Sequence, residues 1–250
     1  MTAPILPGAE PFSAPGGPHG ALVVHGFTGN VSSMRPLAEA FAVAGFAVEA
    51  PLLPGHGTSV EDMIPTRFED WWGEVLAAYE RLASRCEKVV AAGLSMGGTL
   101  VCRLAVERPG LAGVVAINPA IVPPADPAAI REAIEGGMEL MPGIGSDIAK
   151  PGSVESAYEG TPMAPALSLA EACQALVPDL PRISCPVLLL SSREDHVVPS
   201  ESGDTLAASA GGPVERVWLE RSFHVATLDW DAPVIEEAAI AFARKVTAAG

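Results

Sequence analysis

The sequence predicts an α/β fold in which helices flank a mostly parallel central sheet. Short apolar runs typical of buried strands alternate with amphipathic segments of helical period, and this order is characteristic of a parallel sheet. The apolar runs are nearly continuous, which indicates a sheet covered on both faces. With 250 residues, 49% of them hydrophobic, the chain can bury a large core.

Six segments have the strand pattern and are bounded by glycine, proline or polar residues. They are residues 20–26, 45–51, 87–93, 113–118, 186–192 and 214–220. Helices are expected over 34–44, where Pro36 lies near the start, over 98–107, and from Asp231 and Pro233 towards Val246. A further helix carries Phe68, Trp72, Val75, Tyr79 and Leu82 on one face, and Thr66 and Glu69 form the expected capping box before it.

Residues 119–185 interrupt this alternation. The segment has no strand-like run, is rich in Ala, Pro, Met and Gly, and has helical patches near 127–135, 153–159 and 166–176. Because a structureless loop of this length is improbable in a compact domain, we expect a small helical cap over the carboxyl ends of the strands. Residues 1–118 and 186–250 would then form the core of a single structural domain.

Charge and composition restrict the partners. The chain has 30 acidic and 15 basic residues, a formal charge of -15, so its surface should repel nucleic acid and anionic lipid headgroups. The first 20 residues lack the pattern of a secretory signal, and no apolar run is long enough to span a bilayer, so we expect a cytoplasmic protein. The four cysteines (Cys86, Cys102, Cys173 and Cys185) have no CxxC or zinc spacing, which predicts buried, reduced thiols.

The clearest chemical signal is Gly93-Leu94-Ser95-Met96-Gly97, which fits the pattern G-x-S-x-G. It follows a predicted strand and precedes a predicted helix, the context that a nucleophile elbow requires. The glycines leave space for a tight turn that exposes the serine hydroxyl. The same pattern also occurs in ordinary glycine-rich β–α turns, but this context favours Ser95 as a nucleophile.

A serine hydroxyl needs a base, and the base needs an orienting acid. In folds with this elbow the chain order is serine, acid, histidine, which excludes His19, His25 and His56. His224 is preferred because it lies in a loop between the last predicted strand and the last helix, whereas His196 adjoins the expected acid, where neighbouring side chains diverge. The acid should follow the strand at 186–192, where Asp195 is preferred and Glu194 is the alternate. Asp229, which follows the histidine, is interpreted as a turn or helix-start residue.

The tetrahedral intermediate of acyl transfer also needs two hydrogen-bond donors. The backbone N–H of Met96, at a helix N-terminus, is one candidate, and the N–H of Phe27 in the loop HGFTGN is the other. His25 is expected to bond within that loop. His56 is interpreted as a loop-bracing residue and not as a metal ligand, because no second ligand has a useful spacing.

The strings HGFTG, SMRPLAEA, GHGT, EDM, GLSMGGTL, GSD, AYEGTP, EDHVVP and HVATLDWD together resemble the bacterial, Bacillus-type monoacylglycerol lipases of the α/β-hydrolase fold. The sequence is also similar to the small carboxylesterases, which are related to these lipases. The resemblance runs from about Leu6 to the last helix and is weakest over 120–143. It implies hydrolysis of a monoacylglycerol to fatty acid and glycerol, with Ser95, Asp195 and His224 as the triad and Phe27 and Met96 as oxyanion donors. It also implies that Glu155 lies where a glutamate contacts the glycerol. Glu159, one helical turn further on, would face the same way, and a solvated cap helix would account for both residues.

Several consequences of this interpretation remain open. The apolar residues Leu140, Ile144, Leu167 and Leu169 would line an acyl tunnel, or form only the core of the cap. The reaction would need neither metal nor organic cofactor, and contact with a lipid surface would be transient. The alternatives are a short-chain carboxylesterase or thioesterase with the same triad and, less favoured, a non-catalytic ligand receptor, which need not keep all of these groups. Dehalogenases and epoxide hydrolases are disfavoured because they carry aspartate where Ser95 stands.

Overall fold

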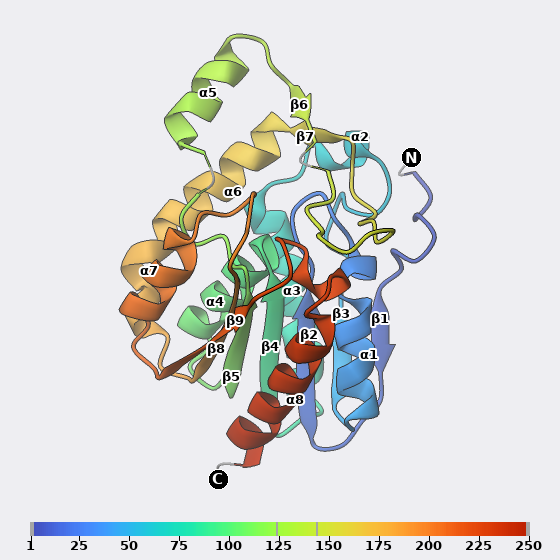
Figure 1. The fold of residues 1–250 in the computed structure, drawn as a ribbon, viewed down its shortest axis with the longest axis vertical. Coiled ribbons are helices and arrows are strands. Elements are labelled where there is room, and N and C mark those ends of the chain that lie inside the picture. Colours follow the sequence, from blue (N-terminus) through green and yellow to red (C-terminus); the bar gives the residue numbers. More distant parts are fainter. Residues whose placement is uncertain (1–2, 124, 144, 249–250) are drawn as a thin grey trace.

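A seven-stranded sheet runs through the centre of the molecule in a computed structural model that describes residues 3–123, 125–143 and 145–248 (Figure 1). Its strand order is β1-β3-β2-β4-β5-β8-β9. The strands are β1 (Phe12–Ala14), β2 (His19–Val24), β3 (Ala47–Ala50), β4 (Lys88–Leu94), β5 (Gly113–Ile117), β8 (Val187–Ser192) and β9 (Val214–Leu219). The short edge strand β1 is antiparallel to β3, and the other pairs of this sheet are parallel. The predicted α/β fold is confirmed.

Helices cover both faces of the sheet. The helices α1 (Arg35–Val43) and α8 (Ala232–Ala248) pack together on one face, and α3 (Phe68–Ala83) and α4 (Met96–Glu107) lie on the other (Figure 1). The remaining helices of the core are α2 (Val60–Met63) and α7 (Glu201–Ser209). Short 3-10 turns lie at Val31–Ser33 and Ala226–Leu228 in the core and at Val177–Arg182 before β8.

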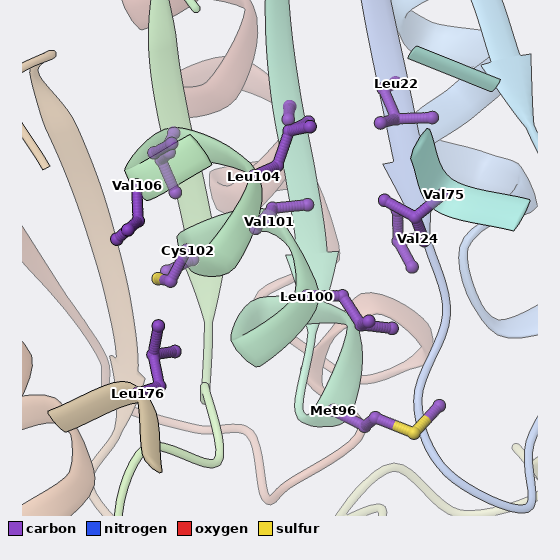
Figure 2. Close-up of a cluster of buried hydrophobic side chains, with 14 of the residues drawn as sticks. Leu22, Val24, Val75, Met96, Leu100, Val101, Cys102, Leu104, Val106 and Leu176 are labelled. Carbon is purple, nitrogen blue, oxygen red and sulfur yellow. The ribbon is translucent and has the colours of Figure 1, made fainter. Parts of the chain in front are cut away.

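The central strands β2, β4, β5 and β8 are mostly apolar because each of their faces has its own core. In β2, Leu22 and Val24 point towards α3 and α4, whereas Ala21 and Val23 belong to the cluster beneath α1 and α8. Figure 2 shows the first of these clusters, in which side chains of α4 such as Leu104 pack against the strands. Full burial of one leucine or valine contributes about 1.5–3 kcal/mol, so this arrangement fixes the register of the central strands.

The insertion, which we define as residues 119–185, leaves the sheet after β5 and returns at β8. These two strands pair directly with each other. The insertion contains α5 (Pro127–Glu135), β6 (Leu140–Pro142), β7 (Gly160–Pro162) and α6 (Met163–Leu176), and β6 and β7 pair as an antiparallel ribbon. Because α6 packs on α3 and α4 and α5 packs on α6, the insertion is joined to the core along one long helix (Figure 1).

The helical patch expected over 153–159 is wrong. The segment is irregular up to β7, and its backbone bonds to distant loops instead of to itself. The Asn30 side chain donates to the carbonyl of Ser156 (2.6 Å), and the N–H of Tyr158 donates to the carbonyl of Thr28 (3.2 Å). The Tyr158 hydroxyl donates to the carbonyl of Gly55 (2.8 Å). These long-range contacts replace the hydrogen bonds that a helix would make.

The capping box before α3 is also shifted from its expected place. The N-cap is Arg67, whose N–H donates to the Asp70 carboxylate (2.8 Å). Thr66 instead donates its hydroxyl to the carbonyl of Met63 (2.8 Å) and accepts from the Trp71 indole (3.2 Å). The predicted pair Thr66 and Glu69 is therefore wrong by one residue.

The four cysteines are free thiols, three of them buried and Cys86 partly buried. Burial raises the pKa of Cys173 to about 12, which leaves this thiol protonated. Within the described ranges, none of the helices combines the length and the apolar character needed to cross a membrane.

Candidate active site

Ser95 lies in the turn that joins β4 to α4, with φ 55° and ψ -117°. A positive φ is costly for a residue other than glycine, by about 1–3 kcal/mol, and persists only where the surroundings impose it. Here the N–H of Ser95 donates to the carbonyl of Ile117 at the end of β5 (3.0 Å), and its own carbonyl accepts from Ala120 (3.2 Å). The neighbouring strand therefore holds the turn in its strained shape.

The glycines around Ser95 are required by close approach of the backbone. A Cβ on Gly93 would collide with the Gly97 carbonyl, and a Cβ on Gly97 would collide with the carbonyl of Val24 at the end of β2. The first turn of α4 thus lies directly on the ends of two strands. This packing sets the loop after β2 beside Ser95, because a Cβ on Gly26 would lie 3.5 Å from the Ser95 Cβ.

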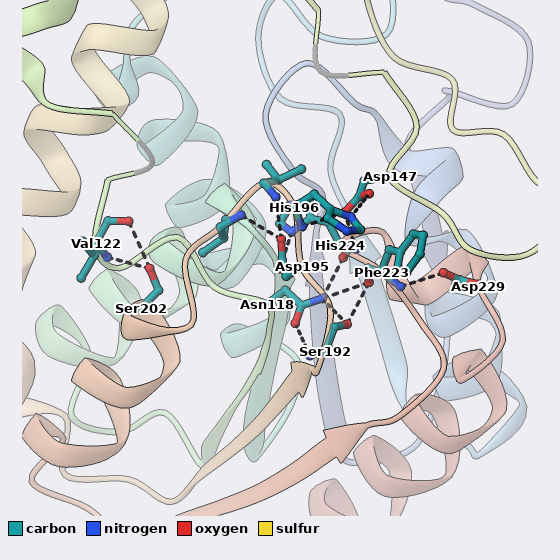
Figure 3. Close-up of polar contacts among 12 residues, drawn as sticks. Asn118, Val122, Asp147, Ser192, Asp195, His196, Ser202, Phe223, His224 and Asp229 are labelled. Atoms are coloured by element: carbon teal, nitrogen blue, oxygen red, sulfur yellow. Dashed lines mark hydrogen bonds and ion pairs between the residues drawn. The ribbon is translucent and has the colours of Figure 1, made fainter.

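His224 and Asp195 meet at the carboxyl edge of the sheet (Figure 3). The Nδ1 atom of His224 lies 2.8 Å from Oδ2 of Asp195, and both side chains are about nine-tenths buried. Burial alone would raise the pKa of Asp195, but the hydrogen bond and charge of His224, together with the N–H groups of Val197 and Val198, lower it. Asp195 is therefore an ionised acceptor that fixes the orientation of the imidazole.

The alternate residues take other places. Asp195 is hydrogen-bonded to His224, whereas Glu194 makes no hydrogen bond to His224 within the described residues. His196 bonds Asp147, with Nδ1 2.7 Å from Oδ1. Asp229 is a buried turn residue, as interpreted from the sequence, and its carboxylate accepts the N–H groups of Ala149, Lys150, Phe223 and Trp230.

A buried asparagine, which the sequence analysis did not single out, connects the loops of this site. Asn118, directly after β5, donates its amide to the carbonyl of His224 (2.8 Å) and to the Ser192 hydroxyl (2.9 Å). Its amide oxygen accepts the N–H of Ser192 (2.8 Å). Figure 3 shows Asn118 between the two loops. One side chain thus ties the end of β8, before Asp195, to the backbone of His224.

The loop after β2 is braced by histidines. His25 lies with Nδ1 2.9 Å from the carbonyl of Gly26, and its Nε2 accepts the N–H of Leu53 (3.2 Å). Burial lowers the pKa of His25 to about 4, so the ring is neutral and Nδ1 carries the donated proton. Because a peptide C=O and N–H point in opposite directions, holding the Gly26 carbonyl fixes the direction of the Phe27 N–H.

His56 belongs to the loop PGHGTS, where its Nδ1 lies 3.1 Å from the carbonyl of Pro54, and it also packs against the loop after β2. Its ring lies 5.0 Å from that of His25 and 6.3 Å from that of Phe27, and burial holds its pKa well below the ordinary value. Among the described residues no cluster of His, Cys, Asp and Glu has the form of a metal site.

A cavity at the carboxyl ends of β2 and β4 brings the candidate residues together. Ser95, His224 and Phe27 line it, and the described part of the insertion contributes Gly145, Asp147, Glu155 and Leu169. Met96 begins α4, so its N–H belongs to the first turn, where backbone donors have no intrahelical acceptor. The insertion therefore closes one side of a cavity that is lined by both the strained serine and the buried histidine.

Of the four residues expected to line an acyl tunnel, Leu169 lies on this cavity. Leu140 lies on β6 instead, where it is 45% exposed, and Leu167 is not part of the lining. Ile144 lies outside the described residues.

Glu155 reaches the cavity from the irregular segment before β7. Its Oε1 would lie 2.6 Å from a Cβ on Gly29, so the carboxyl occupies the space that a side chain there would fill. Burial raises the pKa of Glu155 to about 7, and the charge of His224 and a hydrogen bond from Ser33 oppose that rise. Glu155 is thus a carboxyl group that titrates near neutral pH within the same cavity as Ser95.

Comparison with known proteins assigns this arrangement to a family. The model of the alpha/beta hydrolase family matches residues 21–237. The chain belongs to the alpha/beta hydrolase family. Its resemblance to the bacterial monoacylglycerol lipases is confirmed by a thermostable monoacylglycerol lipase of Bacillus sp. (strain H-257), which is 47% identical over 97% of each chain.

Other relatives of this alpha/beta hydrolase have neighbouring activities. A carboxylesterase of Bacillus subtilis (strain 168) is 27% identical over 95% of this chain and 97% of its own. A solved structure from work on LipS and LipT, two metagenome-derived lipolytic enzymes, is 43% identical, covers 97% of this chain and 100% of its own, and superposes with a TM-score of 0.93.

Proposed function

We propose that this alpha/beta hydrolase is a serine esterase that cleaves monoacylglycerols to a fatty acid and glycerol. The observation that carries the proposal is the buried His224–Asp195 pair, with Nδ1 2.8 Å from Oδ2, because His224 lines the same cavity as a serine held at positive φ. The substrate class follows from the 47% identity with the Bacillus monoacylglycerol lipase. Ser95, His224 and Asp195 are the proposed nucleophile, base and acid.

In the first step Ser95 Oγ attacks the ester carbonyl while His224 takes its proton. Because Nδ1 of His224 is engaged with Asp195, Nε2 is the atom that receives the proton. The ionised Asp195 stabilises the imidazolium that forms. The C–O bond to glycerol then breaks, the glycerol oxygen takes the proton from Nε2, and the acyl group stays on Ser95 as an ester.

In the second step water attacks the acyl-enzyme, His224 again takes and returns the proton, and the fatty acid leaves. In both steps negative charge develops on the former carbonyl oxygen. The N–H groups of Phe27 and Met96 are the proposed donors to that oxygen, and the His25 bond to the Gly26 carbonyl supports the first of them.

A monoacylglycerol has an apolar acyl chain and a polar glycerol end, and the cavity offers both apolar and polar side chains. Leu169, Val197 and Val225 offer apolar contact to an acyl chain, worth about 0.8 kcal/mol for each buried methylene. Glu155 is the proposed partner of the glycerol hydroxyls, since its carboxyl can accept or donate near neutral pH. The insertion is the proposed cap over this cavity.

Transient contact with a lipid surface is part of the same proposal. Met138, Leu140 and Met141, on and before β6, are each more than two-fifths exposed, so the ribbon at the tip of the insertion presents apolar side chains to solvent. With a formal charge of -15, the chain would favour an uncharged or zwitterionic surface over an anionic one.

Steady-state hydrolysis of 1-lauroylglycerol, its diacyl and triacyl counterparts and a butyrate ester tests the substrate class. High kcat/KM for the monoacyl substrate supports the proposal. Preference for the butyrate ester would instead favour a carboxylesterase like the Bacillus subtilis relative.

The serine is tested in the same assay. Ser95→Ala should lower kcat by roughly 10⁶-fold, as loss of a catalytic nucleophile does. Full activity in Ser95→Ala would refute the assignment, and no turnover of any ester by the native chain would favour a ligand receptor.

A further inference from the structure

The loops that carry His224 and Asp195 meet a third loop, which belongs to the insertion. Asp147 Oδ2 accepts the backbone N–H of His224 (3.0 Å) and that of His196 (3.2 Å), and its Oδ1 lies 2.7 Å from Nδ1 of His196. The Asp147 carboxylate therefore bonds the backbone of the proposed base, His224, and also His196, the residue next to the proposed acid Asp195. Figure 3 shows Asp147 beside the two histidines.

The backbone of Asp147 makes a further bond to the same loop. Its carbonyl accepts the N–H of Val225 (3.0 Å), so the peptide groups on both sides of His224 bond this one residue. The Asp147 side chain is 13% exposed, and His224 is nearly buried. Bonds in such a site are weakly screened, and a buried N–H that loses its acceptor is costly.

Asp229 extends this attachment along the insertion. Its Oδ2 accepts the N–H groups of Phe223 (2.9 Å) and Ala149 (2.7 Å), and its Oδ1 accepts that of Lys150 (2.9 Å). Residues 147–150 of the insertion are thereby fixed to residues 223–225. Since Asp147 also lines the cavity, the position of the insertion and the position of the imidazole are set by the same bonds.

We propose that Asp147 is a positioning residue for ester hydrolysis, which holds the backbone of His224 in register with Asp195 and joins that register to the position of the insertion. This inference rests on the proposed function, because it concerns the same histidine. Asp147 acts through His224 and need not touch the substrate.

His196 strengthens the contact in a pH-dependent way. The hydrogen bond and charge of Asp147 raise the pKa of His196, and Glu194 and Asp195 on its own loop act in the same direction. On its other side His196 faces the uncharged ring of Phe223, with ring centroids 4.6 Å apart. The charged form of His196 requires an acceptor at Asp147, whereas the neutral form can also accept a hydrogen bond there.

The test compares Asp147→Ala and Asp147→Asn with Glu159→Ala, a control that removes an exposed carboxylate from the same insertion. Three quantities are measured across the pH range. They are kcat and KM for a short water-soluble ester and for 1-lauroylglycerol, and the rate at which a small fluorophosphonate modifies Ser95. Thermal unfolding of each variant shows whether it is folded.

We expect Asp147→Ala to lower kcat for both esters by about 10- to 100-fold and to slow fluorophosphonate modification by a similar factor, as misplacement of a catalytic group does. KM should change by less than about threefold, because the carboxylate does not bind the substrate. Glu159→Ala should match the native chain in all three quantities.

Asp147→Asn supplies a pH signature. Its amide oxygen can accept both backbone N–H groups, and its amide nitrogen can donate to neutral His196 but cannot accept from the charged ring. The ratio of its kcat to the native kcat should approach one at high pH, where His196 is neutral, and should fall as the pH is lowered and His196 takes up its proton. This readout holds even where Asp147→Ala fails to fold.

Unchanged kcat in Asp147→Ala would overturn the inference, and so would an effect confined to KM for the long-chain ester or a pH-independent ratio in Asp147→Asn. Ser95→Ala in the same series separates the two proposals. If Ser95→Ala is active, the proposed function fails. If Ser95→Ala is inactive and Asp147→Ala behaves as the native chain, only the role of Asp147 fails.

Discussion

The buried carboxyl of Glu155 contributes to the pH dependence of the stability of this protein, and Glu155→Gln should remove that contribution. Burial raises the pKa of Glu155 from 4.5 to about 7. A difference of about 2.5 pH units, at about 1.36 kcal/mol each, means that the ionised carboxylate costs about 3 kcal/mol in the folded state. Because the folded chain holds this proton more tightly than the unfolded chain, stability falls as pH rises from about 4.5 to about 7 and is level above that.

Glutamine stays neutral at every pH, so the difference in unfolding free energy between Glu155→Gln and the native chain isolates this contribution. The difference should grow in favour of the variant by about 2 kcal/mol between about pH 5.5 and about pH 8.5. Urea unfolding followed by tryptophan fluorescence, repeated across this range, measures it.

The exposed neighbour Glu159 is the matched control for this experiment. Glu159→Gln removes the same charge from the same segment, and its difference from the native chain should stay within about 0.5 kcal/mol. A Glu155→Gln difference that is equally flat, or that grows as pH falls, would refute the burial of the carboxyl as the cause.

Two further predictions concern the turn and the loop beside Ser95. His25→Ala frees the Gly26 carbonyl and should lower kcat by about 10²–10³-fold with little change in KM, because one oxyanion donor loses its support. His25→Asn should recover part of this loss. Equal kinetics in the native chain and both variants would contradict the prediction. Gly93→Ala places a Cβ against the Gly97 carbonyl and should cost at least about 3 kcal/mol of unfolding free energy, whereas Gly73→Ala, on an open helical surface, should stabilise by about 0.5–1 kcal/mol. Denaturant unfolding checks both, and similar values for the two would contradict the steric argument.

The six strands of the central sheet other than β1 could be predicted from the sequence, because apolar runs bounded by glycine, proline or polar residues mark them. The short edge strand β1 has no such run and was not predicted. The pattern at 87–93 predicts β4 within one residue at each end, and that at 214–220 predicts β9 equally well. The helix at 127–135 was found with its bounds, since Asp126 caps it and Pro127 opens it. Such signals are local, and local signals suffice where hydrophobic pattern and chain punctuation agree.

The rest of the insertion could not be read in this way because distant contacts decide its conformation. The residues over 153–159 have helical character, but Asn30 and Thr28 bond their backbone from the core. The ribbon of β6 and β7 contains Pro142 and Pro162, which count against strands in any sequence pattern. Composition and period carry no record of partners more than a hundred positions away.

The candidate site shows the same division. Ser95 and the order of acid and base follow from motif and chain order, whereas Asn118 and Asp147 act through bonds to loops that lie 49 or more positions along the chain. The string GSD, which contains Asp147, was the one signal that could have directed attention to the second of these residues.

The direct pairing of β5 with β8 has a consequence for protein engineering. A segment that leaves and re-enters a sheet at adjacent strands can change in length without altering the strand register, and doubling a flexible loop costs only about 0.6 kcal/mol in closure entropy. Residues 125–143 contribute none of the side chains that line the cavity, so this stretch could be exchanged without changing that lining. Residues 147–150 would have to be kept, because a graft that lacks them would leave acceptors and donors around His224 unmatched.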